Sequence, residues 1–173
     1  MWKRYLILCF AIMSLIVATG FVNMGSMKYN AEFHRGGFFD FEAQRGHYVI
    51  LRNPTDLEEH IQRAMKKLRQ DDAIVPEGYF ENLENIMSEE FAKYDEAFFY
   101  TNQLVLAIVD QGSGSVTYEM DRVGLRGGVL TIMVRRKSPM IQTMDFVTTT
   151  IHLTLDATYE IITVHIELVD QTF

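Results

Sequence analysis

The feature that most constrains the fold is an apolar period of two that begins at Leu104. In three successive segments the apolar side chains fall on even-numbered positions: Leu104, Leu106, Ile108, Val116, Tyr118, Met120, Leu130, Ile132 and Val134. Such alternation is typical of strands with one buried face. Directly paired residues of an antiparallel hairpin have a constant sum of residue numbers, so an even sum would place all nine on one sheet face. The sequence therefore predicts a meander (104–136) with strands at about 104–109, 115–123 and 129–136.

Two further strands are expected at about 146–155 and 161–169, joined as a second hairpin (146–169). The side chains predicted to face the core are Ile151, Leu153, Leu155, Ile162, Val164, Ile166 and Leu168. The residues between them are polar and are expected to face solvent: Thr150, His152, Thr154, Thr163, His165 and Glu167.

Two helices are predicted ahead of the meander. Asn53 suits the N-cap of the first helix and Pro54 its first position, and the apolar residues up to Leu68 recur at helical spacing. The second helix is expected within 79–94, after a break at 75–78. A short hairpin is also expected around Gln44-Arg45-Gly46. The fold class is therefore α+β, an antiparallel sheet with a helical pair packed on one face.

The N-terminus has the pattern of an export signal. Lys3 and Arg4 precede an apolar run from Tyr5 to Ala18, and small residues follow up to Gly20. Counted to Val22, the apolar segment approaches the roughly 20 residues that span a bilayer. Residues 1–22 are therefore predicted to be a signal peptide or an N-terminal membrane helix. Both interpretations place the rest of the chain outside the cell membrane, with 23–37 as a tether and 38–173 as one domain.

Charge and cysteine content narrow the class of partner. Cys9, inside the apolar run, is the only cysteine, so the exported part has no disulfide framework, which fits a bacterial protein. Without Lys3 and Arg4 the chain has 14 basic side chains against 23 acidic ones, a net charge near −9. This acidity argues against nucleic-acid binding. The expected partner is another envelope protein, with membrane contact through the N-terminal helix if it is not cleaved.

The glycine-rich stretch DQGSGS, residues 110–115, could suggest a phosphate-binding or catalytic-serine loop. It lacks the Gly-Lys-Ser/Thr ending of a phosphate loop, and a β-period segment follows it instead of a helix. It also does not match the Gly-x-Ser-x-Gly elbow of serine hydrolases. The stretch is therefore interpreted as a hairpin turn. Its tip is the candidate partner-binding segment, with Gln111, Ser113, Ser115 and Tyr118 as the contact residues.

The sequence contains only weak patterns for metal binding or acid–base catalysis. His152 and His165 are predicted cross-strand neighbours, and with Glu167 they could bind zinc. No catalytic group and no organic cofactor are predicted. The acidic residues around the second helix are expected to form a solvated face: Glu81, Glu84, Glu89, Glu90, Asp95 and Glu96. The aromatic clusters at 38–41 and 98–100 are either core or part of an exposed apolar patch.

The stretch from Tyr94 to Pro139 also carries a recognisable arrangement, consisting of Asp95, Phe98, Leu104 to Val109, Gly114, Tyr118, Leu130 and Pro139. In this arrangement the chain resembles the C-terminal domain of PrcB-type protease-complex proteins, and exported proteins of clostridial bacteria, over about 47–168. PrcB-type domains have Gly-Gly-Tyr after the turn, where this chain has Gly114-Ser115-Val116-Thr117-Tyr118. The resemblance implies non-catalytic binding or stabilisation of a partner protein.

Together these features predict an exported or membrane-tethered module of the bacterial cell envelope that binds a protein without catalysis. The alternatives left open are a small metal-dependent hydrolase and a ligand-binding sensor domain on the outer face of the membrane.

Overall fold

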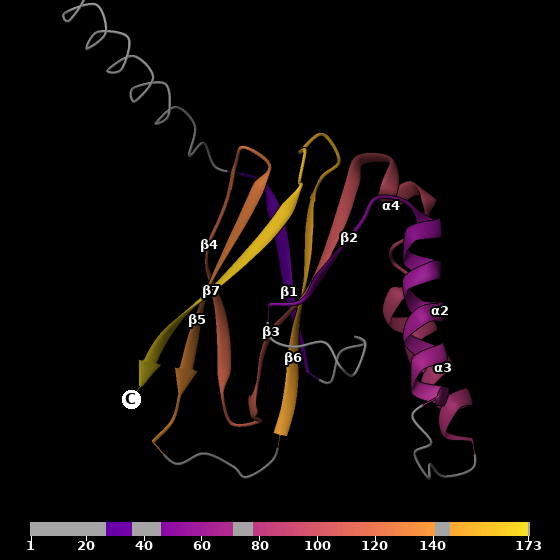
Figure 1. Ribbon diagram of the computed structural model, residues 1–173, viewed down its shortest axis with the longest axis horizontal. Coiled ribbons are helices and arrows are strands. Elements are labelled where there is room, and N and C mark those ends of the chain that lie inside the picture. The colour runs from indigo at the N-terminus through magenta and orange to yellow at the C-terminus, as the bar shows by residue number, and fades with distance from the viewer. Residues whose placement is uncertain (1–26, 36–45, 71–77, 141–145, 173) are drawn as a thin grey trace, which may run out of the picture.

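The computed structural model describes residues 27–35, 46–70, 78–140 and 146–172, and over these residues the chain forms three layers (Figure 1). The middle layer is an antiparallel sheet with the strand order β1 (Tyr29–Arg35), β6 (Phe146–Asp156), β3 (Asn102–Ser113) and β2 (Tyr48–Leu51). A second sheet has the order β4 (Thr117–Arg126), β5 (Val129–Ser138) and β7 (Thr163–Thr172). The helices are α2 (Pro54–Gln70), α3 (Tyr79–Phe91) and α4 (Glu96–Thr101). The predicted α+β class is confirmed.

The helical layer forms where the sequence predicts it. The side chain of Asn53 accepts a hydrogen bond from the backbone N–H of Asp56 at 2.8 Å, and Asp56 in turn accepts one from the backbone N–H of Arg52 at 2.8 Å. The first of these bonds satisfies a backbone donor that the first turn of α2 leaves free, and the second fixes the residue before the cap. The apolar faces of α2 and α3 pack against the four-stranded sheet. The predicted N-cap and the helical pair on one sheet face are therefore confirmed.

Strand β3 is buried on both faces. Leu104, Leu106 and Ile108 pack under the helices in one core cluster. The alternate residues Val105, Ala107 and Val109 pack against the second sheet in the other cluster. All six side chains are at most 1% exposed. A strand with two buried faces has a continuous apolar run in place of an alternating one, and Leu-Val-Leu-Ala-Ile-Val is such a run.

The predicted meander is wrong at its first turn. β3 pairs with β6 and β2, whereas β4 pairs with β5 in the other sheet. Residues 114–116 therefore carry the chain from one sheet to the other and do not close a hairpin. The nine even-numbered residues also do not share a face, because Leu104, Leu106 and Ile108 lie on the helix side while the core residues of β5 lie between the sheets.

The predicted hairpin 146–169 is wrong for the same reason. β6 pairs with β1 and β3, and β7 pairs in parallel with β5. Thr150 and His152 were expected in solvent, but they are buried, because the helices cover that face of β6. Thr154 on the same face is half-buried. Ile162 was expected in the core and is instead 70% exposed.

Hairpin β4–β5 is the part of the meander that forms. Its turn is Gly127-Gly128, both with positive φ (56° and 79°), as a two-residue type I′ turn requires. A turn of two residues pairs odd with even positions, as in Leu125 with Leu130. A bulge between Met120 and Arg122 then restores even pairing, so that Met120 faces Val134.

The N-terminal half of the chain needs one correction. Tyr29–Arg35 lie within the predicted tether (23–37) but form β1, an edge strand of the middle sheet. The predicted signal or membrane helix (1–22) and the first arm of the early hairpin lie outside the described residues. Among the described helices, none is long and apolar enough to cross a membrane.

The turn Gly127-Gly128 provides a test of the β4–β5 geometry. The methyl group of alanine at Gly127 would meet no atom of the described residues within 4 Å, apart from its chain neighbours. The substitution should lower the free energy of unfolding by about 1–2 kcal/mol, the cost of positive φ. Alanine at Gly128 should lower it further, because the new methyl group would lie 2.6 Å from Cδ1 of Ile162. Urea denaturation measures both losses. Equal losses, or no recovery when Gly128→Ala is combined with Ile162→Ala, would contradict this packing.

Candidate functional site

Three polar side chains from three elements meet under the C-terminal turn of α3. They are His34 of β1, Glu90 of α3 and His152 of β6. Oε1 of Glu90 lies 3.1 Å from Nδ1 of His34 and 3.5 Å from Nε2 of His152. The two imidazole rings are stacked, with centroids 3.9 Å apart and planes 20° from parallel. We call these three residues the His–Glu–His cluster.

The strand register explains why the two histidines meet. In the β1–β6 pair, His34 lies opposite Thr150 and Glu32 lies opposite His152. The histidines are therefore diagonal neighbours on one sheet face, a separation that large side chains bridge. Glu90 reaches them because it lies three residues after Met87 and four before Tyr94, which places it on the buried side of α3 and the turn that follows.

An oxygen atom lies near the other ring nitrogen of each histidine. The hydroxyl of Tyr94 lies 3.2 Å from Nδ1 of His152, at hydrogen-bond distance. Oε2 of Glu32 lies 3.5 Å from Nε2 of His34, and Glu32 also pairs with Lys93. The side chains around the cluster are thus held by contacts within the protein.

Burial sets the protonation of His152. His152 is only 3% exposed. Burial, together with the electrostatic effects of His34 and Lys93 and partly opposed by Glu32, lowers the pKa of His152 from its ordinary value to about 3. Burial likewise raises the pKa of Tyr94, which stays a neutral phenol. His152 is therefore neutral at neutral pH, the state in which an imidazole binds a metal.

The structure separates the three residues predicted to bind zinc. His165 and Glu167 lie on β7 in the other sheet, where both are exposed and 3.3 Å apart. His152 lies on β6 and meets His34 and Glu90 instead. The prediction that His152 and His165 are cross-strand neighbours is therefore wrong, because β6 and β7 do not pair.

The predicted partner-binding residues surround the crossover between the two sheets. Gln111, Ser113, Ser115 and Tyr118 are all half-buried. The hydroxyl oxygens of Ser113 and Ser115 lie 2.8 Å apart, and Tyr118 donates a hydrogen bond to Asp110 at 2.9 Å. Asp110 is 5% exposed and lies 3.3 Å from Nε of Arg136. These contacts make the segment part of the junction between the sheets.

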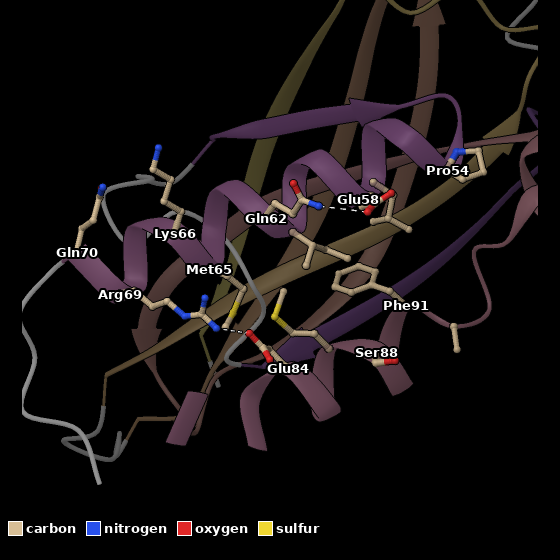
Figure 2. A pocket seen from close by; sticks show the side chains of 14 residues that line it. Pro54, Glu58, Gln62, Met65, Lys66, Arg69, Gln70, Glu84, Ser88 and Phe91 are labelled. Carbon is tan, nitrogen blue, oxygen red and sulfur yellow. Dashed lines mark hydrogen bonds and ion pairs between the residues drawn. The ribbon is translucent and has the colours of Figure 1, made fainter. Parts of the chain in front are cut away.

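A groove runs between α2 and α3 (Figure 2). Its volume is about 770 Å³. Apolar side chains from both helices line it: Leu57, Ile61, Met65, Met87 and Phe91. Polar side chains also line it, including Glu58, Gln62 and Lys66 of α2 and Glu84 and Ser88 of α3. We call this feature the α2–α3 groove. The sequence analysis found both helices but not the space between them.

The groove and the cluster share one turn of α3. Phe91 lines the groove, and its ring stacks on His152 with centroids 5.5 Å apart and planes 14° from parallel. Glu90, the adjacent residue, belongs to the cluster. A shift of this turn would therefore move both features together.

Comparison with family models, with curated proteins and with solved structures finds no match to this chain. The resemblance to PrcB-type domains stays a prediction.

Tyr118 gives a pH test of the inter-sheet junction. Burial, with the hydrogen bond to Asp110 and its negative charge, raises the pKa of Tyr118 to about 12. Between pH 10 and 12 the unfolded chain loses this proton while the folded chain keeps it, so stability should fall as the pH rises. Denaturation curves should show a steeper fall for the unaltered protein than for Tyr118→Phe. Parallel curves would contradict a hydroxyl that is buried against Asp110.

Proposed function

We propose that this protein is an exported or membrane-tethered module of the bacterial cell envelope that binds an apolar segment of another envelope protein in the α2–α3 groove. The groove is the observation that carries the proposal. A volume of about 770 Å³ is typical of binding pockets, which are mostly apolar with a few placed polar groups. The leader pattern at 1–22 and the acidic, cysteine-free remainder support an extracytoplasmic location.

The lining favours a peptide with apolar side chains. Met65 and Met87 are only 6% and 2% exposed, but their flexible thioethers can shift to admit partners of different shape. A groove between two neighbouring helices can hold a third, amphipathic helix, whose apolar residues at i, i+3, i+4 and i+7 would follow the groove.

The charges along α2 give such a segment a preferred direction. Glu58, Gln62 and Lys66 are spaced four residues apart and so form one row along the groove. The row is acidic near the start of α2 and basic near its end, where Arg69 pairs across the groove with Glu84 of α3 (Figure 2). A partner segment with a basic residue at the Pro54 end and an acidic one at the Gln70 end would complement it.

Site-specific photocrosslinking in the native cell envelope tests the proposal. A crosslinking amino acid at Gln62, which lines the groove, should capture a protein segment, and mass spectrometry should identify it as apolar with charges in the stated order. The matched control is the neighbouring exposed Arg63, which does not line the groove. Equal capture from both positions, or capture of a small molecule alone, would contradict a peptide groove.

A pair of substitutions tests the same groove by its chemistry. Ile61→Glu places a charge among the groove residues and should abolish the Gln62 crosslink. Ile86→Glu alters a 48%-exposed isoleucine of α3 that does not line the groove and should leave the crosslink unchanged. Circular dichroism must show that both variants are folded. Retention of the crosslink in folded Ile61→Glu would refute the proposal.

A further inference from the structure

We propose that His34, Glu90 and His152 bind one divalent transition-metal ion of the zinc type. The inference goes beyond protein binding and does not depend on it. One ligand atom from each residue lies within 4.8 Å of the other two. The three residues come from β1, α3 and β6, far apart in the sequence, so that only the folded protein forms the site.

The distances suit a tetrahedral ion. For bonds of about 2.0–2.1 Å, as zinc makes with imidazole nitrogen and carboxylate oxygen, neighbouring ligand atoms of a tetrahedron lie roughly 3.3–3.4 Å apart. Oε1 of Glu90 lies 3.1 Å from Nδ1 of His34 and 3.5 Å from Nε2 of His152. Both distances are close to the edge of such a tetrahedron, so the ligand atoms would need to move only slightly to bind one ion. The two imidazole planes, now nearly parallel, would have to tilt until both lone pairs point at one position.

The partners outside the cluster are of the kind that metal-binding histidines use. Such a histidine almost always hydrogen-bonds through its other nitrogen to a carboxylate or another oxygen, which fixes the ring and its tautomer. Glu32 stands at Nε2 of His34, and Tyr94 stands at Nδ1 of His152. With a metal on Nε2, Nδ1 of His152 would carry the proton and would donate a hydrogen bond to the Tyr94 hydroxyl oxygen.

The cluster is incompletely satisfied without an ion. Oε1 of Glu90 and Nε2 of His34 are buried and make no hydrogen bond among the described residues, although each lies at ion-pair distance from a neighbour, Nδ1 of His34 and Oε2 of Glu32 respectively. Buried polar atoms of this kind are rare, because losing water without gaining a partner costs free energy. A cation between the two rings and the carboxylate would satisfy Oε1 directly and strengthen the pairing of His34 with Glu32.

The ligand set selects the class of metal. Two imidazoles and one carboxylate suit zinc and its neighbours in the first transition row, whereas Ca²⁺ and Mg²⁺ require oxygen ligands. The side chains of His34 and Glu90 are 26% and 20% exposed, against 2% for His152. An ion would therefore enter from the side of His34 and Glu90, where water can supply a fourth ligand.

Zinc titration of the full chain, first freed of metal with EDTA, tests the site. Isothermal titration calorimetry should show one zinc per chain, and Co²⁺ should give the visible absorption of a tetrahedral site. His34→Gln and Glu90→Gln should abolish both signals, and they alter half-buried residues, so they are expected to fold. His165→Gln is the matched control, because His165 is an exposed histidine beside a glutamate on the other sheet and should leave binding unchanged.

Tyr94→Phe gives an independent readout, because it removes the hydroxyl beside Nδ1 of His152 without altering any of the three proposed ligands. It should weaken zinc binding by about 10- to 100-fold while the stoichiometry stays at one. The proposal is overturned if the folded, metal-free protein binds no zinc, or if folded His34→Gln and Glu90→Gln bind zinc as the unaltered protein does. Loss of binding in His165→Gln alone would place the metal on β7 instead. Crosslinking at Gln62 reports separately on the groove, so the two proposals can fail independently.

Discussion

The structure depends on the burial of β3 from both sides. Leu104, Leu106 and Ile108 require a cover on one face, and Val105, Ala107 and Val109 require one on the other. Helices α2 and α3 cover the first face, and the sheet β4–β5–β7 covers the second (Figure 1). Removing a buried leucine side chain from such a core typically costs about 2–5 kcal/mol, so this one strand contributes a large part of a domain's net stability.

The candidate site is a consequence of that packing. His152 lies directly opposite Leu106 in the β3–β6 pair, so the helical layer that covers Leu106 covers His152 as well. A polar ring in that position needs polar partners, and the end of α3 supplies Glu90 while the turn that follows supplies Tyr94. Phe91, between those two residues in the sequence, lines the α2–α3 groove. The proposed metal site and the proposed peptide groove thus depend on the last turn of α3 and the residues that follow it.

Much of the local structure could be predicted from the sequence, and most of the pairing could not. The Asn53 cap and the helical spacing in α2 depend on neighbouring residues, and both were predicted. Which strands pair depends on contacts between distant residues, and the even-numbered pattern was compatible with a single sheet. The odd positions of 104–109 are also apolar, which indicates a strand with two buried faces instead of one. The sequence analysis does not identify His34, because it predicts a tether where β1 forms. It does not identify Glu90, because the neighbouring acidic residues are expected to be solvated. The spacing of Glu90 from Met87 and Tyr94 nevertheless places it on the apolar side.

Native-state amide hydrogen exchange tests the central claim that β3 is enclosed by two separate layers. The amides of Leu104 to Val109 lie in β3, which pairs with β2 and β6 in a sheet that is covered on both faces. They should therefore be among the slowest in the chain and should exchange only on global unfolding. Amides of α2 and of the edge strand β4 should exchange faster, through local opening. Exchange of the β3 amides at the rate of α2 would show that loss of the helical layer already exposes the strand, and would contradict the account.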